Sequence, residues 1–153
     1  MSAPRQVGFE PAEIRTEEST RTARLKWVIV VDERLPKGRA ANAAVCVAAA
    51  TSAAVPGLLG PDGKDATGSV HPGMPWIGCS ILGATADQLA EIRAKAGEDV
   101  HVADMPEVAQ ATRVYDDYLR QLGEDEAPAY LAISLVGPRN RIDKLVKRLP
   151  LLQ

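Results

Sequence analysis

A continuous apolar run, Lys26–Asp32 (KWVIVVD), is followed by turn residues and then by an alanine-rich segment that extends to Ala54. A short run of β-branched residues without polar alternation is typical of a strand that is buried on both faces of its sheet. The turn Leu35–Gly38 (LPKG) leads into a helix predicted from Arg39 to about Ala54, where Pro56 and Gly57 follow. This order indicates the beginning of an α/β fold.

Three further strands are expected, at Trp76–Leu82, Val100–Ala103 and Ala129–Val136. The loop 58–75 between the first helix and the second strand is rich in glycine and proline, and a short strand at Ala66–Val70 is one option within it. Because the strands alternate with helical segments, we predict a three-layer α/β sandwich with a mixed, mostly parallel four-stranded sheet.

The helices after the first one are predicted from their capping residues. Thr85 begins one helix, with Gln88 as its partner in a capping box. Asp104 begins a second helix that extends to Leu122, and Asn140 begins the last one. The chain is expected to hold a polar N-terminal arm at residues 1–25 and a single domain at residues 26–153.

Composition narrows the function classes. The chain of 153 residues has a net charge of -2, which gives no general attraction for nucleic acid or for acidic membranes. Basic residues nevertheless gather near the C-terminus. They indicate either a solvated helix face or a local phosphate-contacting patch. These residues are Arg139, Arg141, Lys144, Lys147 and Arg148.

The cysteines and the hydropathy of the chain allow a prediction of its cellular compartment. Cys46 and Cys79 have neither metal-ligand nor redox spacing, so we predict no metal, no cofactor and no disulfide framework. The first residues lack a signal pattern, and the segment Ala40–Val55 carries polar side chains that make it a poor membrane span. We therefore expect a soluble cytoplasmic protein without membrane contact.

The first turn is a candidate ligand-binding segment. Lys37, Gly38 and Arg39 lie where a buried strand leads into a helix, an edge at which open α/β sheets commonly bind ligands and at which anions are favoured. The segment matches neither the Walker phosphate loop nor GxGxxG, so a turn with two solvated cations is the alternative. Asn42, a polar residue among alanines, faces either solvent or a ligand. We predict these four residues to bind substrate.

Two side chains are candidates for catalysis. Asp104 follows a short strand and could orient a water molecule or a substrate amine, although it also fits the N-cap of a helix that continues with Pro106 and Glu107. His71, in a glycine- and proline-rich loop, could transfer a proton near neutral pH or could be an ordinary surface residue. His101, inside a short strand, is predicted to be structural.

Four segments together carry a family resemblance: KWVIVVDERLPKGRAANAAVCVAAA, WIGCSILGATADQLAEIRAKA, VHVADM and AISLVGPRNRIDKLVKRLPLL. They resemble the archaeal and eukaryotic type of peptidyl-tRNA hydrolase over most of Lys26–Leu152. The Leu-Pro…Ala-Ala-Asn opening more closely resembles domain of unknown function 2000, a bacterial family. The resemblance implies a peptidyl-tRNA hydrolase II-like fold, with a mixed four-stranded sheet between helices, often dimeric, and a cleft at the strand ends.

Residue by residue, the resemblance to the hydrolases is incomplete. Asn42 stands where that family has glutamine, and the position of its catalytic lysine falls on Gly38. The histidine expected after the glutamine becomes Val45. Asp104 matches the motif aspartate, but Met105-Pro106-Glu107 replaces the residues that should follow it.

Two functions therefore stay open. The first is a diverged hydrolase acting on an aminoacyl or peptidyl ester or amide, with aminoacyl- or peptidyl-tRNA as a candidate substrate. In it Asp104 would orient water, Lys37 or Arg39 would hold a phosphate or carbonyl oxygen, and His71 would transfer a proton. The alternative is a non-catalytic dimeric module that binds a small metabolite or a protein partner. A homodimer is expected in either case.

Overall fold

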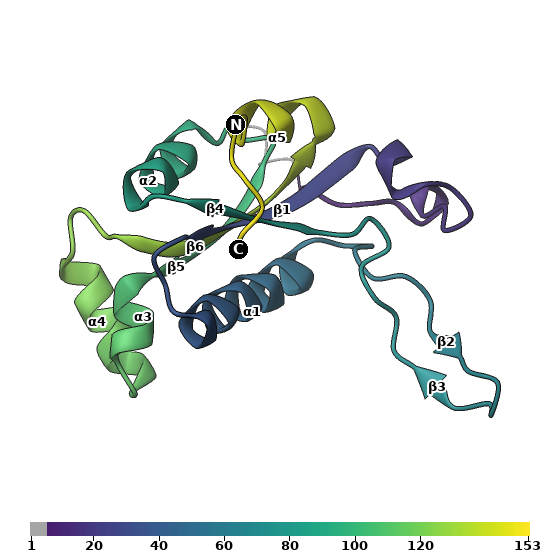
Figure 1. Ribbon diagram of the computed structural model, residues 1–153, viewed down its shortest axis with the longest axis horizontal. Coiled ribbons are helices and arrows are strands. Elements are labelled where there is room, and N and C mark those ends of the chain that lie inside the picture. The colour runs from purple at the N-terminus through teal and green to yellow at the C-terminus, as the bar shows by residue number, and fades with distance from the viewer. Residues whose placement is uncertain (1–5) are drawn as a thin grey trace.

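The computed structural model describes residues 6–153, and its centre is a four-stranded sheet (Figure 1). The strands are β1 (Leu25–Asp32), β4 (Ser80–Ala84), β5 (His101–Pro106) and β6 (Tyr130–Pro138). They lie in the order β4-β1-β6-β5. The first five residues of the expected N-terminal arm lie outside the described residues.

The sheet is mixed, as expected, but the prediction that it is mostly parallel is wrong for its strand pairs. β4 pairs parallel with β1, whereas β6 lies between β1 and β5 and pairs antiparallel with both. The physical reason is that the helical segment 107–129 lies at one end of the sheet and does not cross its face, so the chain returns beside β5 in the opposite direction (Figure 1). A buried apolar run has the same sequence pattern in either direction, so the pattern of β6 did not indicate its orientation.

Helices cover both faces of this sheet, which confirms the three-layer arrangement. α1 (Lys37–Ala54) lies on one face, and α2 (Ala86–Lys95) and α5 (Arg139–Leu145) lie on the other (Figure 1). α3 (Glu107–Ala111) and α4 (Tyr115–Glu124) form a pair at one end of the sheet (Figure 1). Among the described residues, no helix has the length and hydropathy that crossing a bilayer requires.

Two hydrophobic cores result, one on each face of β1. Trp27, Ile29 and Val31 pack in the core beneath α1, whereas Val28 and Val30 pack in the core beneath α2 and α5. This alternation confirms that β1 is buried on both faces. The buried side of α1 consists of small residues at helical spacing, which lets the helix lie close to the sheet. They are Ala40, Ala43, Val47 and Thr51.

The described part of the N-terminal arm packs against the domain. It contains two short 3-10 helices, η1 (Pro11–Glu13) and η2 (Thr20–Thr22). Phe9 is buried, and its ring centroid lies 4.8 Å from that of Trp76. The arm is therefore anchored by an aromatic pair at the same end of the molecule as the loop 58–75.

That loop carries a two-stranded hairpin, β2 (Gly63–Lys64) and β3 (Val70–His71), which projects from the body of the domain (Figure 1). The expected strand at Ala66–Val70 is wrong except at its last residue. Asp65 instead begins a turn in which its carboxylate accepts hydrogen bonds from the backbone of Thr67 and Ser69. All residues from 61 to 72 are exposed.

Several expected boundaries were also wrong, although the Thr85–Gln88 capping box is confirmed. Asp104 and Asn140 are not N-caps, because β5 and β6 each continue to a proline that precedes the helix. The expected helix from Asp104 to Leu122 is two helices, since Thr112 and Val114 take extended backbone angles. β-Branched residues favour such angles.

Candidate functional site

The first turn of α1 and the helix α3 meet at the edge of the sheet where β1 and β5 end. Gln110 of α3 donates from Nε2 to the Arg39 carbonyl oxygen at 2.9 Å and to Asn42 Oδ1 at 3.1 Å. Arg39 Nε in turn donates to Gln110 Oε1 at 2.9 Å. The structure therefore brings the predicted Arg39 and Asn42 together through Gln110, which the sequence interpretation did not identify.

Asp32 is a buried carboxylate at the end of β1, beside this contact. It accepts hydrogen bonds from the Arg34 backbone N–H at 3.0 Å and from the Arg34 guanidinium at 3.2 and 3.3 Å. Burial raises the pKa of Asp32, but the hydrogen bonds from Arg34 lower it by more, and the pKa lies below its usual value. The sequence feature that could have indicated this site is the aspartate at the end of the apolar run Lys26–Asp32.

A small cavity of about 250 Å³ opens next to Asp32. Its charged lining comes from Asp32, Arg34, Arg39 and Glu107. The volume is below the range of about 300–1,000 Å³ that is usual for drug-sized ligands. This cavity therefore suits an ion or one polar group of a ligand.

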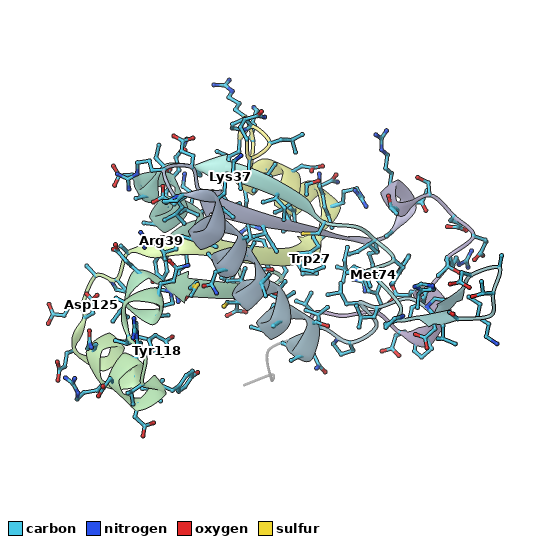
Figure 2. The ribbon with its side chains drawn as sticks, turned by 60° about the horizontal axis from the view of Figure 1, so that its bottom comes forward. Trp27, Lys37, Arg39, Met74, Tyr118 and Asp125 are labelled. Carbon is cyan, nitrogen blue, oxygen red and sulfur yellow. The ribbon has the colours of Figure 1, made fainter. Side chains whose placement is uncertain are left out.

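Lys37 and Gly38 take no part in this network. Lys37 is exposed and, within residues 6–153, has no ion pair or side-chain hydrogen bond. In Figure 2 it lies at the start of α1, away from Arg39. A Cβ atom built on Gly38 would meet nothing within 4 Å, so the glycine is not required for close packing there.

Asp104 lies in β5 and forms an ion pair with Arg93 of α2. Arg93 Nε donates to Asp104 Oδ2 at 2.8 Å, and the Asp104 side chain is 19% exposed. The hydrogen bond to Asp104 raises the pKa of Arg93. Arg93 also lies over the ring of Tyr130, 5.1 Å from its centroid. Asp104 is therefore held in place from the α2 side of the sheet, whereas its second oxygen, Oδ1, has no hydrogen bond in the described part of the chain.

A larger cavity, of about 500 Å³, lies where α1, the end of β5 and the α3–α4 pair meet. Its lining includes the polar residues Asp104, Thr112 and Arg113, together with Cys46. The segment 106–122 therefore forms walls of this cavity. The remaining lining is mainly apolar or aromatic: Ala49, Met105, Pro106, Ala109, Val114, Tyr115 and Tyr118.

Two tyrosines of α4 form one wall of the large cavity. Their rings pack edge to face, with centroids 5.4 Å apart. Burial raises the pKa of Tyr118, and the nearby Tyr115 and Asp104 raise it further. The phenol is therefore neutral at physiological pH and can donate a hydrogen bond. Figure 2 shows Tyr118 on the α4 side of the molecule.

His71 does not join Asp104. It lies on the projecting hairpin, at the end of the molecule opposite the α3–α4 pair (Figure 1). Its Nε2 lies 2.9 Å from Asp65 Oδ2. Hydrogen bonds from Thr67 first, and then from His71, hold the pKa of Asp65 at about 2. The predicted catalytic pair is thus separated by the length of the sheet.

The cysteines and acidic residues do not gather into a metal site. Within residues 6–153, no group of three or more His, Cys, Asp or Glu side chains lies close enough together to hold a metal ion. Cys46 is exposed and Cys79 is half-buried. Burial raises the pKa of Cys79 to about 12, so its thiol is protonated at neutral pH.

Comparison with known proteins places the chain in a family. The model of the family described as "Protein of unknown function (DUF2000)" matches residues 25–153. The chain belongs to this family. A similar solved structure is that of a protein of unknown function, Atu0240, from Agrobacterium tumefaciens strain C58. It is 16% identical, with a TM-score of 0.70 over 84% of this chain and 97% of that chain.

At this level of identity, the likeness to the solved structure shows the fold alone. No curated protein matches the chain. Neither comparison supports the resemblance to peptidyl-tRNA hydrolases, which stays a prediction.

Proposed function

We propose that this member of the DUF2000 family is a non-catalytic module that binds a small zwitterionic ligand with an apolar part, such as a free amino acid. The observation that carries the proposal is the cavity of about 500 Å³ between α1, β5 and the α3–α4 pair. Small-molecule sites are typically cavities of this size, with apolar walls and a few polar groups that fix the orientation of the ligand.

The charges of the lining support a zwitterion. Asp104 and Arg113 both belong to the lining of the cavity. Arg113 has no ion pair among the described residues, and Asp104, which pairs with Arg93 on the α2 side, has one carboxylate oxygen without a hydrogen bond among them. An ammonium group would lie near Asp104 and a carboxylate near Arg113. The rings of Tyr115 and Tyr118 would also attract the ammonium group through their faces.

The geometry gives less support to a hydrolase. General acid–base catalysis requires the base to lie within hydrogen-bond or one-water reach of the reacting group. His71 lies on the hairpin, and the carboxylate of Asp104 is already paired with Arg93. We therefore expect no release of N-acetyl-aminoacyl groups from tRNA above background. Release by the wild type that Asp104→Asn abolishes would restore the hydrolase prediction.

Isothermal titration with leucine and phenylalanine tests the binding proposal. Arg113→Gln is expected to weaken binding by about tenfold, because a charge-assisted hydrogen bond is lost. Asp104→Asn should weaken it similarly. Asp116→Asn is the matched control, since Asp116 is exposed on α4 and does not line the cavity. Absence of binding at millimolar ligand, or equal affinity in Arg113→Gln and wild type, would contradict the proposal.

The expected homodimer remains part of this proposal. Large apolar side chains are exposed on both helices that flank the cavity: Val45 of α1 is 66% exposed, and Tyr115 and Leu119 of α4 are 73% and 49% exposed. A second copy of the chain that covers them would remove an apolar patch from water. Sedimentation equilibrium tests this, and a monomer at micromolar concentration would contradict it.

A further inference from the structure

A groove of about 490 Å³ lies between α2 and α5, on the face of the sheet opposite α1. It is separate from the cavity assigned above to the zwitterionic ligand. The side chains that line it come from α2 and from α5 with the residues that follow it. They are Gln88, Glu91, Ile92, Lys95, Arg141, Lys144, Leu145, Lys147 and Leu149.

The groove is positively charged, although the chain as a whole has a net charge of -2. Its lining holds four cationic side chains, from Lys95, Arg141, Lys144 and Lys147, and one carboxylate, that of Glu91, while Asp99 outside the lining pairs with Arg141. Glu91 forms an ion pair with Lys95, which lowers the pKa of Glu91 and keeps it ionised. A concave site lined by one sign of charge concentrates its field, so the groove attracts anions.

Arg141 has a structural role in the groove. Its Nη2 donates to the Lys95 carbonyl oxygen at 3.3 Å, and its Nε lies 3.5 Å from Asp99 Oδ1. Arg141 thereby compensates the negative end of the α2 dipole. Gly97 leaves room for it, because a Cβ atom there would lie 2.8 Å from Arg141 Nη2.

Lys144 and Lys147, in contrast, are exposed and have no ion pair or side-chain hydrogen bond within residues 6–153. Neither charge is used to hold the fold together in the described chain. These two ammonium groups therefore remain available to a ligand, in addition to the partly neutralised Lys95.

We propose that this groove binds a small phosphorylated molecule that carries at least two phosphate groups. Lysine ammonium groups bind phosphate oxygens as point charges, and several of them around one groove favour a ligand with more than one phosphate. Ile92, Leu145 and Leu149 give the groove an apolar surface for the rest of the ligand. No aromatic side chain lines it, so the bases of single-stranded nucleic acid would have no ring to stack on.

Titration calorimetry with orthophosphate, pyrophosphate, tripolyphosphate and ADP tests this proposal on the full chain. Affinity should rise from orthophosphate to tripolyphosphate. It should fall when the salt concentration is raised from about 50 to about 200 mM, because salt screens the attraction between exposed charges. The double variant Lys144→Gln/Lys147→Gln should lose about tenfold or more in affinity for tripolyphosphate. Both lysines are exposed, so we expect the melting temperature of this variant to match the wild type.

The matched control is Lys37→Gln/Lys64→Gln, which removes the same charge from two exposed lysines that lie outside the groove and have no ion pair in the described chain. Equal loss in the two double variants would show general charge attraction and would overturn the proposal. The proposal would also be overturned if no binding were detected at a tripolyphosphate concentration of about 10 mM. A 20-nucleotide RNA that binds more tightly than tripolyphosphate through the same lysines would replace the small molecule with nucleic acid and would likewise overturn it.

Discussion

A chain of buried polar side chains links β1, α1 and β6 beneath the alanine-rich helix. Trp27 Nε1 donates to Ser134 Oγ at 2.8 Å, and Thr51 Oγ1 lies 2.7 Å from both Ser134 Oγ and the Val47 carbonyl oxygen. Each hydroxyl has one proton. When the Thr51 hydroxyl donates to the Val47 carbonyl oxygen and the Ser134 hydroxyl donates to Thr51 Oγ1, all three donors, including the Trp27 indole N–H, have an acceptor. Thr51 and Ser134 are fully buried, so water cannot replace a lost partner.

Replacing Ser134 with alanine removes the acceptor of the Trp27 indole N–H. An unpaired buried donor costs about 1–3 kcal/mol, whereas Thr51 keeps its bond to the Val47 carbonyl. We therefore expect the free energy of unfolding to fall by about 2 kcal/mol in urea denaturation followed by circular dichroism. For a domain of this size, the melting temperature should fall by roughly 4–8 °C.

A double-mutant cycle separates the hydrogen bond from the packing. In a Trp27→Phe background the indole N–H is absent, so Ser134→Ala should cost at least about 1 kcal/mol less than in the wild type. If Ser134→Ala costs less than about 0.5 kcal/mol in the wild type, or the same amount in both backgrounds, the hydrogen-bonded chain is not what holds these elements together.

Three further predictions concern single side chains, each measured by urea denaturation. Thr85→Ala removes the acceptor of the Gln88 backbone N–H and should cost about 1 kcal/mol, whereas Thr85→Ser should cost little; equal losses would exclude the cap as the cause. Arg148 has a φ of 69°, so Arg148→Gly should raise the free energy of unfolding by about 1 kcal/mol, and a loss would contradict this. The Asp32 carboxylate has a pKa below its usual 3.8, so its contribution to stability is present above that pH and is lost as the pH falls through the folded-state pKa. Asp32→Asn should therefore flatten the acid side of the stability curve, and an unchanged slope would refute the assignment.

Local sequence signals predicted the parts of the fold that depend on neighbouring residues. The β-branched run predicted that β1 is buried on both faces. The alanine-rich segment predicted α1, and the pair Thr85 and Gln88 predicted the start of α2. Each of these depends on residues within one or two turns of the chain. The same locality explains the errors at Asp104 and Asn140, where a residue suited to capping a helix lies inside or just beyond a strand that the sheet extends.

The candidate site could be predicted only in part, because its geometry depends on contacts between distant segments. Arg39 and Asn42 were found from their place at the start of α1, but Gln110, which joins them, lies about 70 residues later in the chain. Nothing in the local sequence of Asp104 indicates its pairing with Arg93 of α2. The loop position of His71 suited catalysis, yet the hairpin that carries it projects away from the other candidates.

The position of β1 between β4 and β6 has a consequence for folding during synthesis. β1 is translated early, whereas its partner β6 is among the last elements of the chain. In the pairing of these two strands, Trp27 lies opposite Val136. At typical translation rates, about 109 residues take roughly 5–20 s to make. Throughout that interval one edge of Val28–Val31, a β-branched segment free of charge, has no strand to pair with. During this interval we therefore expect the unpaired edge of β1 to be prone to pairing with other chains.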